Sequence, residues 1–219
     1  MEARAMPESE RARELTARKG RVVEAAFRCF CGGGIEGTTI EEIARHAKCG
    51  AATVYRYFET KENLALACGR KFWLDGQTRY DALRATADFQ HACGMEQVRL
   101  LMNASLAYFQ EAQPAFRFIH DLDGFLLSHR VPTEDLSQYE QVVDGLRPYL
   151  CDALEKGRAD GSMARREDST ELYYTLTTAI FGTMQKLAAA GLLLKSDASV
   201  GSARKVELLI ELLLAGLRG

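Results

Sequence analysis

The sequence predicts an all-α protein on three observations. Apolar residues recur at helical spacing along almost the whole chain of 219 residues. The alternation of apolar and polar residues that is typical of half-buried strands is absent. Each of the four prolines can stand at or near a helix start or in a loop: Pro7, Pro114, Pro132 and Pro148. We expect helices at residues 11–31, 39–46, 51–57, 60–84, 94–112, 114–128, 134–158, 168–190 and 203–217.

Composition limits the class of function. The chain carries 28 basic and 30 acidic residues, so any nucleic-acid surface must be local rather than a global basic field. No stretch approaches the roughly 18 apolar residues that a membrane span needs. The polar N-terminus also has no apolar signal core, so we expect a cytoplasmic protein without membrane contact.

The six cysteines are scattered without a CxxC pair, which predicts free thiols rather than a disulfide framework. Cys29 and Cys31 lie two residues apart on an expected helix and therefore point to different faces. His91 and Cys93 supply only two ligands, whereas a zinc site needs three or four. We therefore expect no metal and no cofactor.

The first expected helix, 11–31, has an apolar stripe that includes Val22, Ala26 and Phe30, and it ends at a run of three glycines. Its other face is basic. Between residues 11 and 28 there are six basic and two acidic side chains, although an ordinary solvated helix face would carry many of them as well.

Two short helices follow, at 39–46 and 51–57. Thr38 with Glu41, or equally Thr39 with Glu42, fits the capping box that opens a helix. Val54 and Phe58 share the buried side of the second helix, while its outer face carries Ala51, Ala52, Tyr55 and Arg56. This layout has the form of a helix-turn-helix, in which small residues let the second helix enter the major groove of DNA.

The segment TTIEEIARHAKCGAATVYRYFETKENLALA closely resembles the DNA-binding segment of the TetR family of transcriptional regulators, and the resemblance covers roughly residues 20–67. It implies an N-terminal three-helix domain, residues 1–64, and a larger C-terminal helical domain, residues 65–219, for ligand binding and dimerisation. A weaker similarity, LEKGRADGSM at 154–163, resembles the turn before the dimerisation helices of that family.

Carried over to this chain, the family's DNA contacts fall on Thr38 or Thr39, Ala51, Ala52, Thr53, Tyr55, Arg56, Tyr57 and Lys61. Lys48 stands where the family usually has a glycine, and Gly50 where it has a hydroxyl cap. Either the turn is reshaped or Gly50 takes over its bend. Lys48 and Arg56 are the candidates for reading guanine.

The last expected helices predict a partner. Leucines and other apolar residues surround almost the whole circumference of 203–217, which indicates burial on nearly every side, either in a homodimer or entirely within the monomer. We assign the dimer contact to one set of residues: Leu176, Ile180, Met184, Leu209 and Leu213.

The middle region is rich in aromatic residues and resembles nothing in particular. Most of its rings are expected in the core, but a mostly apolar cavity there would suit a small hydrophobic ligand. The residues assigned to such a ligand are Trp73, Tyr108, Phe116, His120 and Thr177.

The resulting hypothesis is a repressor that releases a palindromic DNA operator when a small apolar or aromatic effector binds. The alternative is a helical adaptor that dimerises without sensing a ligand. An enzyme is not expected, because the glycine-rich stretch CGGGIEGTT lacks the lysine placement of a phosphate-binding loop and does not follow a strand.

Overall fold

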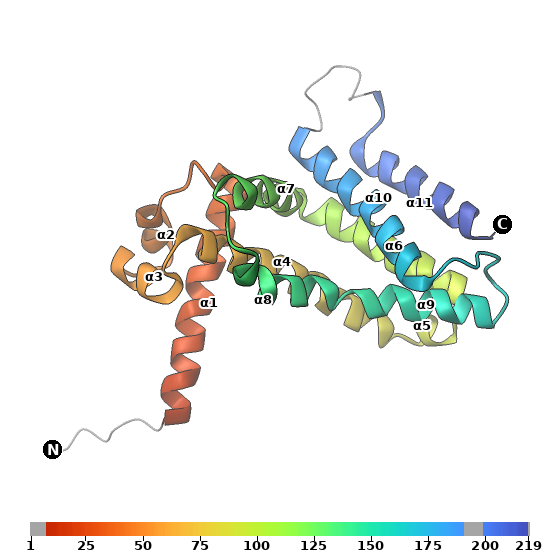
Figure 1. Ribbon diagram of the computed structural model, residues 1–219, viewed down its shortest axis with the longest axis horizontal. Helices are drawn as coiled ribbons and strands as arrows, with labels where there is room; N and C mark the ends of the chain where they lie inside the picture. The colour runs from red at the N-terminus through yellow and green to blue at the C-terminus, as the bar shows by residue number, and fades with distance from the viewer. Residues whose placement is uncertain (1–7, 191–198, 219) are drawn as a thin grey trace.

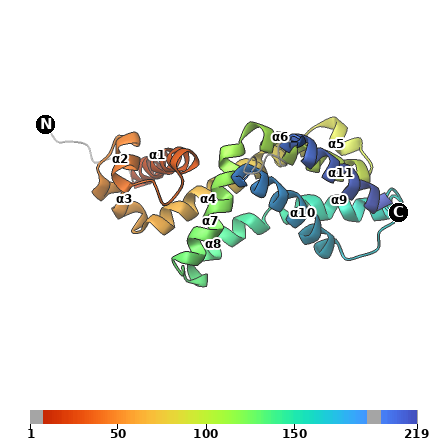
Figure 2. The same ribbon diagram turned by 90° about the horizontal axis from the view of Figure 1, so that it is seen from above.

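The computed structural model describes residues 8–190 and 199–218, and this part of the chain contains α-helices but no strand. Figures 1 and 2 show an elongated molecule with the N-terminal helices at one end and a larger helical bundle at the other. None of the helices in the described ranges combines the length and apolar character needed to cross a membrane.

The N-terminal end is built from α1 (Glu8–Gly33), α2 (Ile40–His46) and α3 (Ala51–Phe58). Phe30, Ile43 and Val54, one from each helix, are almost completely buried in their common core. The first turns of α1 project away from the rest of the molecule in Figure 1, and residues 9–21 are all exposed there. Only the second half of α1 carries the apolar stripe that anchors it.

The larger end contains the remaining helices, which begin with α4, the helix that leaves the N-terminal group. They are α4 (Lys61–Arg84), α5 (Ala87–His91), α6 (Gly94–Glu111), α7 (Gln113–Ser128), α8 (Thr133–Asp144), α9 (Arg147–Ala159), α10 (Ser169–Ala190) and α11 (Ser202–Arg218). Helix α6 packs against α9 and α11, and α7 packs against α10. Helix α4 packs against helices of both ends, α1 and α8 among them.

Two glycines bring α6 and α9 into backbone contact. A Cβ added to Gly94 would lie 1.9 Å from the backbone nitrogen of Gly157. The turn after α9 caps the start of α6, because the Gly94 amide donates to Asp160 Oδ2 over 2.7 Å and the Met95 amide to Ser162 Oγ over 3.0 Å. Hydrogen bonds from Ser162 and the Gly94 amide lower the pKa of Asp160.

Helix α1 also contacts α7, which joins the two ends of the molecule. The Phe30 and Phe118 rings stack with centroids 5.9 Å apart, and Phe27 meets the same ring edge-on at 5.4 Å. Arg117 of α7 donates to the carbonyl oxygen of Cys31 over 2.6 Å.

The helix predictions are confirmed apart from two differences. The single helix expected at 134–158 is divided into α8 and α9, since α8 ends at Asp144, Gly145 follows as its C-cap, and Pro148 lies in the first turn of the next helix. Helix α5 was missed because its five residues are too few to display a helical period. All six cysteines are free, as expected.

Candidate nucleic-acid interface and cavity

Helices α2 and α3 form a helix-turn-helix at the tip of the molecule. Thr39 is the N-cap of α2, and its hydroxyl accepts the Glu42 amide over 3.2 Å, which selects one of the two possible capping pairs. Lys48 itself adopts the left-handed bend of the turn, with φ of 55°. Gly50 is the extended N-cap of α3, with φ of −82°. The left-handed bend of the turn is therefore made by Lys48, in a conformation that favours glycine, and Gly50 does not take it over.

A basic cleft of about 460 Å³ lies between α1, the turn and α3. It is lined by Arg18, Arg21, Ala47, Lys48, Cys49, Thr53, Arg56 and Tyr57. Among the described residues, Arg21, Lys48 and Arg56 form no ion pair with an acidic side chain, whereas Arg18 pairs with Glu14 at 3.0 Å. Positive charge without a partner is what phosphate oxygens require.

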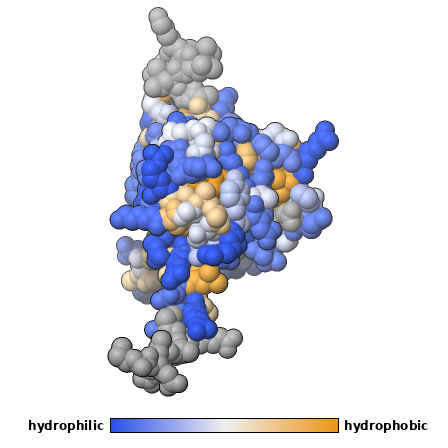
Figure 3. Space-filling model, turned by 90° about the vertical axis from the view of Figure 1, so that its left-hand side faces the viewer, coloured by the Kyte–Doolittle hydropathy of each residue, from blue (hydrophilic) through white to orange (hydrophobic). Residues whose placement is uncertain are grey.

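Aromatic side chains border this basic cleft. The guanidinium of Arg56 lies 5.3 Å from the Tyr57 ring centroid, and Lys19 Nζ lies 6.0 Å from the same ring. Tyr55 on the outer face of α3 is 48% exposed. Figure 3 views this end of the molecule, whose surface is mostly hydrophilic with a few apolar patches.

Most of the predicted DNA-contact residues lie on or beside this surface. Thr39, Lys48, Ala52, Tyr55 and Arg56 are exposed, and Ala51, Thr53 and Tyr57 are half-buried.

Thr38 and Lys61 lie elsewhere. Thr38 is 2% exposed, and its hydroxyl donates inward to the Gly34 carbonyl over 2.7 Å, so it cannot face DNA. Lys61 Nζ donates to the Glu36 carbonyl over 3.3 Å and lies 6.0 Å from the Phe125 ring centroid, which directs it toward α7. Arg18, Lys19 and Arg21 were not among the predicted contacts, although the basic excess on the first helix pointed to them.

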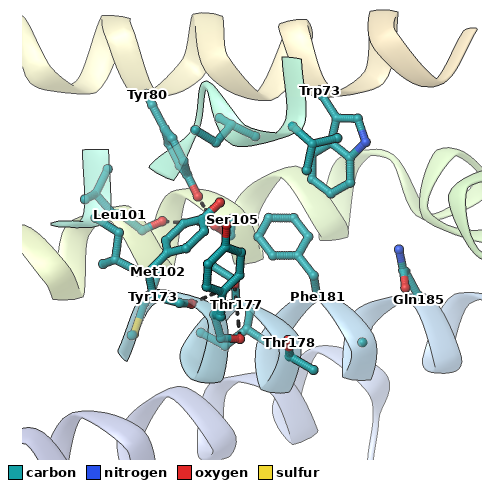
Figure 4. A pocket seen from close by; sticks show the side chains of 16 residues that line it. Trp73, Tyr80, Leu101, Met102, Ser105, Tyr173, Thr177, Thr178, Phe181 and Gln185 are labelled. Atoms are coloured by element: carbon teal, nitrogen blue, oxygen red, sulfur yellow. Dashed lines mark hydrogen bonds between the residues drawn. The ribbon is translucent and has the colours of Figure 1, made fainter. Parts of the chain in front are cut away.

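A second site is a cavity of about 290 Å³ inside the larger bundle, bounded by α4, α6, α8, α9 and α10 (Figure 4). Its lining residues are Trp73, Tyr80, Leu101, Met102, Ser105, Val143, Leu146, Leu150, Tyr173, Tyr174, Thr177, Thr178, Ile180, Phe181, Gly182 and Gln185. Among the described residues, no charged side chain lines it. Such a lining suits a neutral apolar group.

Several of the polar side chains that line the cavity form hydrogen bonds within the protein. Tyr80 Oη and Ser105 Oγ lie 2.6 Å apart, and the Ser105 hydroxyl can also donate to the Leu101 carbonyl over 3.1 Å. Burial raises the pKa of Tyr80 above its usual range, which keeps the phenol neutral. The Thr177 hydroxyl donates to the Tyr173 carbonyl over 2.7 Å.

The predicted ligand residues fall into three groups. Trp73 and Thr177 line the cavity. Tyr108 and Phe116 are buried in the aromatic core behind it, with their rings 5.4 Å apart. His120 is exposed on α7 and does not line the cavity. The sequence also suggested Thr178, which lines the cavity, but it did not assign Tyr80, Ser105 or the remaining lining residues to a ligand, because no local motif relates residues brought together from different helices.

Residues 22–68 match the family described as bacterial regulatory proteins, tetR family. Over this segment the chain resembles the TetR family of transcriptional regulators. A curated relative, the HTH-type transcriptional repressor AcnR of Corynebacterium diphtheriae, is 34% identical over 58 residues. The match spans 26% of this chain and 30% of that repressor, so it covers less than a third of the relative's length.

Solved TetR-family structures share the fold over nearly the whole chain. FadR of Bacillus subtilis in complex with stearoyl-CoA is 17% identical with a TM-score of 0.66, over 90% of this chain and 97% of that one. FadR of Thermus thermophilus in complex with lauroyl-CoA is 20% identical with a TM-score of 0.63, over 91% and 94%. At this identity the likeness concerns the fold, an N-terminal helix-turn-helix domain followed by a larger helical domain.

The predicted dimer residues are divided between core and surface. Leu176, Ile180 and Met184 of α10 are each no more than 4% exposed within a single chain, so they pack in its own core and do not face a partner. Leu209 and Leu213 of α11 are half-buried. The apolar side chains exposed on the two helices are different ones: Tyr174, Leu208 and Leu212, the last of which is 71% exposed.

Proposed function

We propose that this protein is a dimeric repressor in which residues 1–64 bind a palindromic DNA operator and residues 65–219 bind an apolar effector that releases it. The observation that carries the proposal is the course of α4, which begins beside the helix-turn-helix at Lys61 and reaches the wall of the uncharged cavity at Trp73. One rigid element therefore touches both sites.

The basic cleft supports a division of roles on DNA. Arg56, on the outer face of α3, and Lys48, in the turn, are placed to read guanine in the major groove. Ala51, Ala52 and Thr53 present methyl groups suited to thymine. Arg21 of α1, which has no acidic partner, and the exposed Tyr55 of α3 are suited to phosphate oxygens, which fix the position of the protein on DNA.

The effector is inferred from the lining of the cavity. Since none of the described residues that line it is charged, an alkyl or aromatic group fits better than a carboxylate or a phosphate. Two TetR-family neighbours bind stearoyl-CoA and lauroyl-CoA, and the acyl part of such a molecule has the required character. A charged headgroup would stay at the rim, where Tyr174 and Thr178 of α10 are exposed.

Trp73 is the proposed connection between effector and DNA. Its indole Nε1 donates to Tyr139 Oη of α8 over 2.9 Å, and its ring lies 5.4 Å from that of Phe181. A ligand that separates Trp73 from Phe181 would shift α4. This shift would also move the reading head, which is the helix-turn-helix of α2 and α3. Such a ligand weakens DNA binding only by its preference for the shifted state, for which a coupling of about 1–3 kcal/mol is typical.

A homodimer supplies the second reading head. We place its contact on the exposed apolar side chains of α10 and α11, namely Tyr174, Leu208 and Leu212. Two heads must lie about 34–36 Å apart to read adjacent major-groove half-sites. Replacing Leu212 with glutamate should give monomers and abolish operator binding, which sedimentation and a mobility shift would measure.

The test is an anisotropy titration of a labelled duplex taken from the DNA upstream of the protein's own gene, at two salt concentrations. A steep salt dependence supports the DNA surface, whereas a helical adaptor would show none. Lauric acid and lauroyl-CoA are then added, while the emission of Trp73 is recorded. Release of the duplex with the same concentration dependence as the Trp73 change supports the proposed route.

A matched pair of variants locates the effector. Thr178→Phe narrows the mouth of the cavity, whereas Thr175→Phe adds the same ring to an exposed position of the same helix outside it. Only Thr178→Phe should weaken the response to the acyl probe. Equal loss in both variants, or none in either, would place the effector elsewhere.

A further inference from the structure

Three side chains with metal-binding atoms lie close together in the reading domain, by which we mean the N-terminal group of α1, α2 and α3. They lie where α1 packs on α2. Cys29 belongs to α1, while Glu42 and His46 stand one turn apart on α2. One ligand atom from each residue, the Cys29 sulfur, a Glu42 carboxylate oxygen and a His46 ring nitrogen, lies within 4.8 Å of the other two. Cys29 and Glu42 are half-buried, and His46 is exposed.

These three side chains are not engaged elsewhere. Within the described ranges, none of these three side chains forms a hydrogen bond or an ion pair with another residue. The folding of the helix-turn-helix therefore does not need this grouping for its own hydrogen bonding. Their backbone positions are fixed, since Ile43 and Ala44 of α2 and Ala26 and Phe30 of α1 lie in the core on either side.

We propose that Cys29, Glu42 and His46 bind one Zn²⁺ ion per chain. A thiolate, an imidazole and a carboxylate are the three ligand types that zinc takes from proteins, and water can fill the fourth position of a tetrahedral site. Hard cations such as Mg²⁺ prefer oxygen ligands alone, so the sulfur and nitrogen atoms select against them. The thiolate and the carboxylate together neutralise the charge of the ion.

The geometry needs only a small adjustment. Zinc bonds of about 2.0–2.3 Å place two ligand atoms of a tetrahedron about 3.5 Å apart, so the three atoms must approach one another by about an ångström. The glutamate and histidine side chains can make this movement by rotating about their side-chain bonds, since both reach the solvent. The bound ion would link α2 to α1 through its ligands and so stabilise the packing of the reading domain.

The experiment uses Co²⁺ as a spectroscopic probe on the full chain, freed of metal with a chelator and kept reduced. We expect a thiolate-to-cobalt absorption band that saturates at one ion per chain and is displaced by Zn²⁺. Zn²⁺ should raise the melting temperature, and Mg²⁺ at the same concentration should leave it unchanged.

Matched variants assign the ligands. Cys29→Ser should abolish the cobalt band, and His46→Gln should weaken Zn²⁺ binding at least tenfold. Cys31→Ser, half-buried two residues further along α1, and His91→Gln, exposed on α5, should bind as the original protein does. His46 is exposed, so its replacement does not threaten the fold and keeps the proposal testable if Cys29→Ser is unstable.

Two results would overturn the proposal. One is a cobalt band that survives in Cys29→Ser or disappears equally in Cys31→Ser. The other is a Zn²⁺ affinity that does not differ between His46→Gln and His91→Gln. DNA binding enters none of these measurements, so the proposed zinc site and the proposed repressor function can fail independently.

Discussion

The two ends of α4 belong to regions that differ in how much they share with relatives. At Lys61 the helix starts beside a reading domain that matches a family model over residues 22–68 and a curated repressor at 34% identity. Past Trp73 it walls a cavity in a bundle that shares a fold with structures no more than about a fifth identical. Under the proposed function, the first region contacts DNA and the second contacts an effector. The segment that matches the family model is therefore the one that would contact DNA.

The largest expected effect concerns the packing of helices in the C-terminal bundle. Gly94→Ala would place a methyl group against the backbone of Gly157, where neither helix can move aside without losing its cap. We expect a loss of about 3 kcal/mol or more in the free energy of unfolding, measured by urea denaturation.

Gly124→Ala is the matched control for that change. It also lies inside a helix, α7, but nothing stands within 4 Å of its added Cβ. The substitution should stabilise the protein by about 0.5–1 kcal/mol, since alanine favours a helix over glycine. Equal effects of the two substitutions would show that the close contact of α6 and α9 is not required.

The next effect concerns DNA binding by the N-terminal helices. Arg56→Ala and Arg21→Ala each remove a cation without an acidic partner from the basic cleft. Arg56→Ala should reduce the free energy of DNA binding by about 1–3 kcal/mol and relax the preference at one base pair. Arg21→Ala should weaken binding to all DNA sequences alike and lower the slope of log affinity against log salt concentration by about 1. Arg84→Ala, at the far end of α4, is the control and should leave DNA affinity unchanged. If Arg56 and Arg21 gave the same profile on operator variants, the division of roles would be wrong.

A smaller effect separates stability from recognition at one residue. Lys48→Gly removes a left-handed lysine and should stabilise the domain by up to about 1 kcal/mol, yet it should weaken DNA binding because it removes a cation from the cleft. Glu59→Gly relieves a φ of 63° in the same way but removes a negative charge. It should therefore stabilise without loss of affinity, as thermal melts and anisotropy would record.

The same contrast explains what could be predicted from the sequence. Helix periods and the cap at Thr39 are local signals, so the helix-turn-helix and most helix bounds followed from them. The inward orientation of the Thr38 side chain could not be predicted from local signals, because the hydrogen bond of its hydroxyl to the Gly34 carbonyl determines it. The burial of Leu176, Ile180 and Met184 depends on which face of α10 the other helices cover, and the apolar pattern alone left that open.

The site residues divide in the same way. Arg56 and Tyr55 could be placed because they lie off the buried stripe of one short helix. The cavity could not, since its lining comes from α4, α6, α8, α9 and α10, and long-range packing alone brings these together. The grouping of Cys29 with Glu42 and His46 escaped for the same reason: the contact of α1 with α2 creates it.

The smallest expected effect concerns the joint between the two regions. Lys71 of α4 lies 3.3 Å from Glu24 of α1 and 2.9 Å from Asp75 of its own helix. Burial lowers the pKa of Lys71, but Asp75 and Glu24 raise it further, so the ammonium stays charged at neutral pH. Both carboxylates are partly exposed, and exposed ion pairs contribute only about 0.2–1 kcal/mol. Glu24→Gln and Asp75→Asn should therefore each lower the free energy of unfolding by less than about 1 kcal/mol. Only Glu24→Gln breaks a contact between α1 and α4, so only it should change the effector response of DNA binding. An unchanged response in Glu24→Gln would mean that the aromatic contact of α1 with Phe118 carries the coupling without this ion pair.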